Sequence, residues 1–148
     1  MNILMVCLGN ICRSPLAQGI LESKVDANKV FVDSAGTSGW HDGKYADSRS
    51  IEVAEKNGLD ITNQRSRKFI QEDFDRFDLI YAMDKSNYKN IIALARSVED
   101  EQKVKMILNE IAPNDKDVPD PYYGGKNGFV DVYNMLDEAC DIIASKIQ

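Results

Sequence analysis

The junction between a short apolar segment and a loop that opens a helix most constrains the fold. Residues Asn2 to Val6 are apolar and β-prone, which predicts a buried strand. A loop from Cys7 to Arg13 follows, and Ser14 and Pro15 then predict a helix start, with Ser14 as the N-cap and Pro15 in the first turn. A loop held between a strand and a helix N-terminus can direct several backbone N–H groups at one anion.

Strands and helices alternate along the rest of the chain. The periodicity predicts strands at 30–33, 78–83 and 103–108, and helices at about 47–57, after Asp84, and over 129–147. The tripeptide at 34–36 is expected to bound the second strand. This alternation predicts an α/β sandwich with a parallel sheet, in which ligands bind beyond the carboxyl ends of the strands. The loop after the first strand and the loop before the last helix are therefore the expected sites of chemistry.

Composition limits the classes of function. A chain of 148 residues with 43% hydrophobic and 28% charged residues predicts one domain, residues 1–148. The net charge of −6, with scattered Lys and Arg, makes nucleic acid a poor partner. Three cysteines and one histidine argue against a disulfide framework or a structural zinc site, so we expect no metal and no cofactor. Without an apolar run of roughly 20 residues or an export signal, we expect no membrane partner and a cytoplasmic location; no feature indicates an oligomeric state.

The loop after the first strand carries a nucleophile and a clamp. Backbone N–H dipoles, Arg13 and the helix N-terminus favour the thiolate of Cys7 over its thiol. Arg13 can hold two phosphate oxygens at once, and Ser14 can donate a hydrogen bond that makes the thiolate a better leaving group. Gly9 and Asn10 tolerate the positive φ angles of a tight loop. We expect the loop to bind phosphate through Leu8, Gly9, Asn10, Ile11, Cys12 and Arg13.

The alternative interpretation makes Cys7 a buried core cysteine and Arg13 a surface charge. It would prevail for a lone cysteine. The Cys-(x)5-Arg-Ser spacing at a strand-to-helix turn argues against it.

The loop before the last helix offers a proton donor. Asp120 lies between Pro119 and Pro121, which stiffen its backbone. A protonated Asp120 can protonate a departing phenolate and then act as base on the hydrolytic water, and a nearby phosphate would help it keep the proton. By itself this segment would more often be a surface turn, but its combination with the Cys7 loop favours the catalytic interpretation.

Aromatic residues near these loops predict the pocket walls. Tyr122 and Tyr123 can flank a substrate phenyl ring, Trp40 can form the opposite wall, and Ile11 adds an apolar surface. His41, the single histidine, is predicted to be a loop residue and not a catalyst.

The sequence resembles the low-molecular-weight protein tyrosine phosphatases over essentially the whole chain. The similarity includes Cys7 to Pro15, Asp33 to Gly36, Trp40 to Arg49, Ala82 to Asp84, and Asp120 to Gly124. The chain departs from the family at Gln64, where a histidine is common.

The resemblance implies a three-layer sandwich with a four-stranded parallel sheet and the phosphate-binding loop after the first strand. It also implies phosphotyrosine hydrolysis in proteins or peptides through a cysteinyl-phosphate intermediate. The implied roles are Cys7 as nucleophile, Arg13 as phosphate clamp, Asp120 as acid, and Asn10 and Ser34 as residues that brace the loop.

Three other functions compete. Arsenate reduction on the same fold needs further cysteines to relay a disulfide, and only Cys140 remains, on the apolar face of the last helix. A phosphoarginine phosphatase resembles this chain but commonly has threonine at the position of Ile11. A non-catalytic phosphate-binding module would have little use for a thiol nucleophile together with an acid.

The loop also suggests redox chemistry. Cys7 and Cys12 share a tightly curled segment, so their sulfurs can approach bonding distance and form a protective disulfide. The alternative, in which Cys12 only packs, is equally supported by the sequence.

Overall fold

Four parallel strands form the central sheet of the computed structural model, which describes residues 1–123 and 126–147, without the side chains of residues 123 and 126. The strands are β1 (Asn2–Cys7), β2 (Phe31–Gly36), β3 (Leu79–Ala82) and β4 (Val104–Met106), in the order β2-β1-β3-β4. All pairs are parallel, so the four-stranded parallel sheet implied by the resemblance is confirmed.

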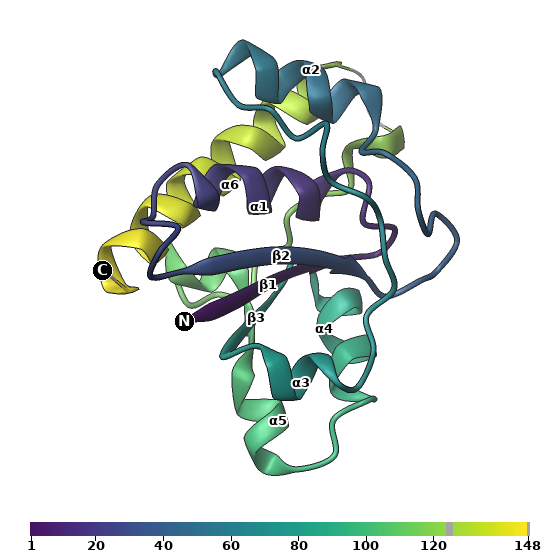
Figure 1. Ribbon diagram of the computed structural model, residues 1–148, viewed down its shortest axis with the longest axis vertical. Coiled ribbons are helices and arrows are strands. Elements are labelled where there is room, and N and C mark those ends of the chain that lie inside the picture. The colour runs from purple at the N-terminus through teal and green to yellow at the C-terminus, as the bar shows by residue number, and fades with distance from the viewer. Residues whose placement is uncertain (124–125, 148) are drawn as a thin grey trace.

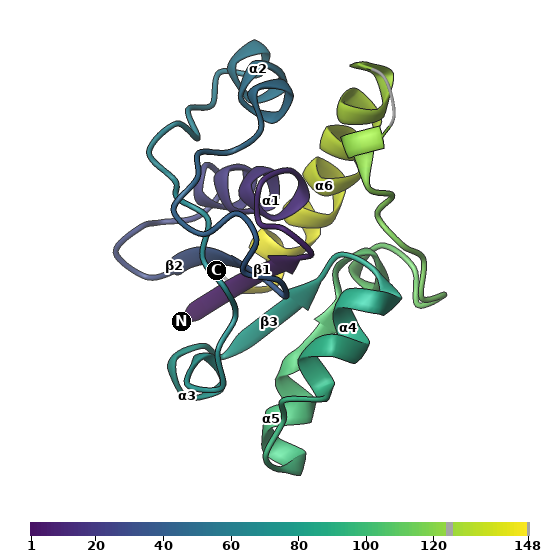
Figure 2. The same cartoon turned by 90° about the vertical axis from the view of Figure 1, so that its right-hand side faces the viewer.

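Helices cover both faces of this sheet and complete three layers (Figure 1). One face carries α1 (Arg13–Glu22), α2 (Ser48–Lys56) and α6 (Lys126–Ile147), and the other carries α3 (Asp73–Arg76), α4 (Lys85–Ile92) and α5 (Val98–Lys103). The view turned by 90° shows the same division (Figure 2). Two short 3₁₀ segments, η1 (Ile107–Glu110) and η2 (Pro121–Tyr123), lie in the connections. Within the described ranges, no helix is both long and apolar enough to cross a membrane.

The continuous apolar character of β1 follows from burial on both faces. Ile3 and Met5 belong to the core beneath α1 and α6, whereas Leu4 and Val6 belong to the core on the opposite face. Alternate side chains of a strand point to opposite faces, so a central parallel strand needs apolar residues at every position. This packing places the loop that follows Cys7 at the carboxyl edge of the sheet.

Among the predicted boundaries that were wrong, two lie beside the Cys7 loop, and tertiary contacts explain both. Strand β2 continues through residues 34–36, because Ser34 pairs with Met5 and Gly36 pairs with Cys7 in the ladder. Helix α1 begins at Arg13 with Cys12 as its N-cap residue, so Ser14 lies inside the helix. Its hydroxyl contacts loop side chains instead of capping the helix.

One carboxylate of the acidic run at 99–101 is buried. Asp100, in α5, is only 5% exposed. It accepts hydrogen bonds from the backbone and side chain of Arg96, which compensate for its lost hydration.

Candidate active site

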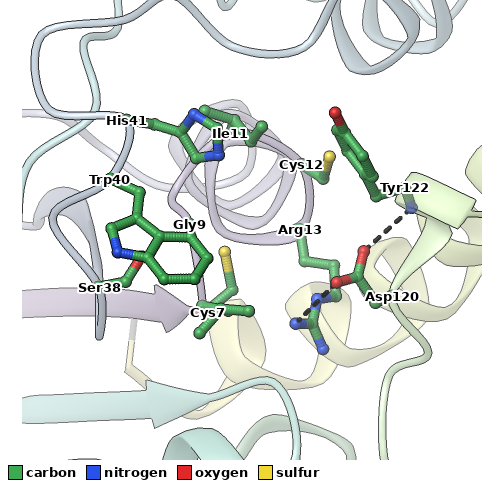
Figure 3. Close-up of a pocket in the computed structure, with 11 residues that line it drawn as sticks. Cys7, Gly9, Ile11, Cys12, Arg13, Ser38, Trp40, His41, Asp120 and Tyr122 are labelled. Carbon is green, nitrogen blue, oxygen red and sulfur yellow. Dashed lines mark hydrogen bonds and ion pairs between the residues drawn. The ribbon is translucent and has the colours of Figure 1, made fainter.

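A pocket of about 260 Å³ lies at the carboxyl end of β1. Figure 3 shows Cys7 between Trp40 on one side and Asp120 with Tyr122 on the other. Its lining residues are Cys7, Leu8, Gly9, Ile11, Cys12, Arg13, Ser38, Trp40, His41, Asp120 and Tyr122. The fold therefore brings together the two loops that were predicted to carry the chemistry, the Cys7 loop and the Asp120 loop. These loops are more than a hundred positions apart in the sequence.

Asn10 shapes the loop from its centre. It adopts a positive φ of 57°, and its buried side-chain amide donates to the hydroxyls of Ser14 and Ser34, at 2.8 and 2.9 Å. Its Oδ1 accepts from the backbone N–H of Arg67 at 3.0 Å. Ser34 in turn donates to Gln18 Oε1 at 2.7 Å. One asparagine thus joins the loop to α1, to β2 and to the segment before α3.

Gly9 has a different role from the one its flexibility suggested. The prediction of a positive φ there was wrong, because Asn10 is the loop residue that adopts one. A Cβ on Gly9 would lie 2.9 Å from His41 Cδ2. A side chain at this position would therefore require the imidazole of His41 to move away from the loop.

The carbonyl groups of the loop are bound by the surrounding structure. Thr37 and Ser38 donate to the carbonyls of Cys7 and Leu8, and Ser66 donates to that of Gly9. The carbonyls of Ile11 and Cys12 accept from the backbone of Asp47 and the hydroxyl of Ser50. Because these carbonyls are held by outer segments, the N–H groups between them are available to an anion inside the loop.

Cys7 has a hydroxyl neighbour at hydrogen-bond distance. Its Sγ lies 3.0 Å from Ser14 Oγ. The Ser14 hydroxyl also accepts from Asn10, and its own proton can be donated either to the sulfur at 3.0 Å or to the carbonyl of Ala35 at 3.5 Å. This arrangement can stabilise a thiolate and assist its departure from phosphorus.

Arg13 is held in the pocket by Asp84, a residue for which no role in the site was predicted. Its Nη1 donates to Asp84 Oδ2 at 2.7 Å and to the carbonyl of Val118 at 2.9 Å. Burial disfavours the guanidinium, but the charges of Cys7, Asp84 and Asp120 outweigh it and raise the pKa of Arg13. The position of Asp84, two residues after the end of β3, was the available signal, since functional groups gather at that edge of the sheet.

Asp120 faces Arg13 from the opposite loop. Its Oδ2 lies 3.9 Å from Arg13 Nη2, and its Oδ1 accepts from the backbone N–H of Tyr122 at 3.0 Å. The side chain is 34% exposed, so a substrate and a water molecule can reach it. The two oxygens therefore have different surroundings, with Oδ2 on the side of Arg13.

The pocket walls contain predicted and unpredicted residues. Trp40 is 85% exposed and Tyr122 is 43% exposed, and both line the pocket with Ile11. Ser38 and His41 also line it, although no pocket role was predicted for them; their nearness to Trp40 was the available signal. The predicted wall residue Tyr123 has its side chain outside the described part of the chain.

The other two thiols are buried and protonated at neutral pH. Burial, reinforced by Asp47 and Cys7, raises the pKa of Cys12 to about 12. Burial also raises the pKa of Cys140 to about 12, and Cys140 is part of the core as expected. A buried, protonated Cys140 is poorly suited to relaying a disulfide.

The surroundings of the pocket were also compared with the predictions for metal ligands and for Gln64. Among the described residues, no His, Cys, Asp and Glu side chains are grouped as metal ligands. Gln64, where the resembling family often has histidine, donates from Nε2 to the Pro15 carbonyl at 3.1 Å. Gln64 thus supports the first turn of α1 just behind the loop.

Comparisons with known proteins agree with this geometry. The profile of the family described as low molecular weight phosphotyrosine protein phosphatase matches residues 2–148. A low molecular weight phosphotyrosine protein phosphatase of Schizosaccharomyces pombe is 42% identical, with 91% of this chain and 89% of the relative covered.

Solved structures are similar over nearly the whole chain. A protein tyrosine phosphatase from Entamoeba histolytica has a TM-score of 0.92 at 37% identity, covering 99% of this chain and 96% of that one. A Drosophila arginine phosphatase has a TM-score of 0.90 at 32% identity, covering 99% and 97%. Since the match spans the strand, the Cys7 loop and the Asp120 loop together, the chain belongs to the low-molecular-weight protein tyrosine phosphatase family.

Proposed function

We propose that residues 1–148 form a single domain that hydrolyses phosphotyrosine in proteins, with Cys7 as nucleophile, Arg13 as phosphate clamp and Asp120 as general acid and base. The convergence of these three residues on one pocket supports the proposal most directly. Asp84 and Val118 occupy Arg13 Nη1, so we assign the phosphate contacts to Nε and Nη2 and to the backbone N–H groups of residues 8–13.

In the first step, Cys7 Sγ attacks phosphorus and forms the S–P bond. The P–O bond to the aryl group breaks, and the aryl oxygen takes its electron pair together with the proton of Asp120. Arg13 and the loop N–H groups stabilise the charge on the equatorial oxygens.

In the second step, a water molecule attacks the cysteinyl phosphate and transfers a proton to Asp120. The S–P bond breaks and its electron pair returns to Cys7, while the hydroxyl of Ser14, 3.0 Å away, donates to the departing sulfur. Inorganic phosphate leaves, and Asp120 is again protonated for the next turnover.

The pocket walls favour an aryl substrate. Trp40 and Tyr122 offer flat surfaces on opposite sides, and Ile11 offers an apolar contact. The structural neighbour from Drosophila, named an arginine phosphatase, keeps phosphoarginine as the second candidate. We place the reaction in the cytoplasm, where reducing conditions suit three unpaired cysteines.

The first test compares phosphotyrosine, phosphoserine and phosphoarginine peptides with one preparation in excess chelator. We expect turnover of phosphotyrosine with undiminished activity, because Arg13 and backbone amides supply the charge that a metal would otherwise supply. Cys7→Ser should abolish turnover yet still bind inorganic phosphate. Preferential turnover of phosphoarginine, or dependence on an added divalent ion, would contradict the proposal.

The second test is Asp120→Asn, assayed with aryl phosphates whose phenols differ in acidity. The amide cannot protonate a leaving group, so kcat should fall about 10²–10⁴-fold for phenyl phosphate. The loss should shrink for nitrophenyl phosphate, whose phenolate is already a stable anion. Equal losses on both substrates would show that Asp120 has only a structural role.

A further inference from the structure

We propose that Arg49 is a positioning residue that fixes the general acid relative to the phosphate loop. This inference rests on the acid role proposed for Asp120. Arg49 lies in the first turn of α2 and does not line the pocket, yet its side chain joins both catalytic loops.

On one side, Arg49 is tied to the phosphate loop through Asp47. Nε and Nη2 donate to Oδ1 and Oδ2 of Asp47, each at 3.0 Å, and the backbone N–H of Arg49 donates to Oδ1 at 2.9 Å. Asp47 in turn donates its backbone N–H to the carbonyl of Ile11 at 2.8 Å. Ser50, one residue after Arg49, adds a contact to the carbonyl of Cys12 at 3.3 Å. The start of α2 is therefore fastened to the phosphate loop at two points.

On the other side, Arg49 holds the end of the acid loop, the segment from Val118 to Tyr122 that carries Asp120. Its Nη1 donates to the carbonyl of Tyr122 at 3.1 Å. Its guanidinium carbon lies 5.2 Å from the ring centroid of Tyr122 and 4.7 Å from that of Phe129, a buried residue of α6. These distances are typical of cation–π contacts. The planar guanidinium thus donates to Asp47 through Nε and Nη2 and to the Tyr122 carbonyl through Nη1, and it also forms cation–π contacts with two aromatic rings.

This contact supplies the second anchor of the acid loop. The first is Val118, whose N–H donates to Met83 at 2.8 Å and whose carbonyl accepts from Arg13. Asp120 lies between Val118 and Tyr122, and its Oδ1 is held by the N–H of Tyr122. Arg49 thus adds a hold on the far side of Asp120 from Val118, and holds on both sides of Asp120 keep Oδ2 near Arg13.

Arginine is specifically suited to this role. A lysine ammonium is a single point charge and cannot place donors on Asp47 and the Tyr122 carbonyl in the same fixed plane. Displacement of a catalytic group by about 1 Å can cost roughly 10²-fold in rate. Loss of Arg49 should therefore impair protonation of the leaving group while leaving the phosphate loop intact.

The test uses Arg49→Met and Arg49→Lys, assayed with phenyl phosphate and nitrophenyl phosphate. We expect kcat for phenyl phosphate to fall about 10–100-fold in both variants, with a much smaller fall for nitrophenyl phosphate. Inhibition by inorganic phosphate should match that of the parent. If the methionine variant does not fold, the lysine variant carries the test.

Arg96→Met is the matched control. Arg96 also forms a fork with carboxylates, on Asp75 and Asp100, and its guanidinium lies 6.0 Å from the Phe74 ring centroid. It does not line the pocket. Its removal costs a similar set of contacts and should leave the ratio of the two substrate activities unchanged.

A double-mutant cycle separates positioning from general stability. In the Asp120→Asn background, Arg49→Met should cause no further loss with phenyl phosphate, because the group it positions is gone. Equal losses of kcat on both substrates in Arg49→Met, or additive losses in the double variant, would overturn the positioning role of Arg49. The proposed acid role of Asp120 would not be affected. A leaving-group-independent loss in Asp120→Asn itself would instead overturn the proposed acid, and the inference with it.

Discussion

Some single residues in this protein form hydrogen bonds to several secondary-structure elements, as Asn10 and Asp84 do. Asn10 combines a positive φ with side-chain hydrogen bonds to two serines on different elements. Asp84 caps α4 through the N–H of Asn87 and also holds Arg13 with its other oxygen. A substitution at either position removes two functions together, and a buried partner left without its hydrogen bond typically costs about 1–3 kcal/mol.

Cys12 provides the prediction at the residue scale. The Cys7 thiol is expected to be oxidised by hydrogen peroxide to a sulfenic acid with release of water, and the Cys12 thiol can then displace a second water to form a disulfide. Because burial raises the pKa of Cys12 to about 12, this second step should accelerate as pH rises. Inorganic phosphate should slow the first step by covering Cys7.

The measurement treats the parent and Cys12→Ser with peroxide, then with a thiol reductant. Each protein is compared with its own starting activity, and the loop peptide is analysed by mass spectrometry. The parent should recover well and Cys12→Ser poorly. Equal recovery without a linked peptide would leave Cys12 with a packing role only.

At the scale of secondary-structure elements, the carboxyl end of β2 packs directly against the backbone of the phosphate loop. Gly36 pairs with Cys7, and a Cβ at this position would lie 2.8 Å from the carbonyl oxygen of Leu8 and 3.1 Å from the N–H nitrogen of Asn10. Both are backbone atoms of the loop, which cannot rotate away as a side chain could. The strand and the loop therefore need glycine here for close approach, not for a positive φ.

Gly36→Ala should displace the loop while preserving the sheet. We expect a loss of about 1–3 kcal/mol in the free energy of unfolding, as for other overpacked sites, together with weaker inhibition by inorganic phosphate. Gly128→Ala is the control, because a Cβ there would meet Pro121 at an ordinary 3.7 Å. Undiminished phosphate binding in Gly36→Ala would show that the loop adapts without cost.

At the scale of the whole molecule, two buried thiols are expected to lower the free energy of unfolding as the pH becomes alkaline. Burial raises the pKa of Cys12 and of Cys140 from 9.0 to about 12. The unfolded chain loses these protons first, so the folded state is favoured fully below pH 9.0 and progressively less as pH rises toward 12.

Urea unfolding of the parent and Cys140→Ala tests this dependence. The free energy of unfolding of each protein is measured at about pH 8 and about pH 10.5. The difference between the two values is then compared between the proteins, so any packing cost of the substitution cancels. The parent should lose more stability than the variant. Identical losses in the two proteins would show that Cys140 does not contribute to the alkaline decline.

The sequence alone determined the features that depend on neighbours along the chain. The apolar run of β1, the loop that follows it and the helix start lie within the first fifteen residues, so their spacing alone placed Cys7 and Arg13. Helix α2 was also well predicted, because Asp47 is its N-cap and Gly58, with a φ of +79°, follows its end. These signals are local backbone preferences and side-chain caps.

Only the tertiary structure decided how the site is held. Arg13 meets Asp84 across 71 positions, Asn10 meets Ser34 across 24, and Arg49 meets Tyr122 across 73. Parallel strands joined by helical crossovers bring the carboxyl ends of distant strands to one edge, and no local pattern specifies which side chains then touch. The sequence could therefore indicate the groups for which we propose catalytic roles, whereas the packing of α2, β2 and the acid loop around them determined their supporting contacts.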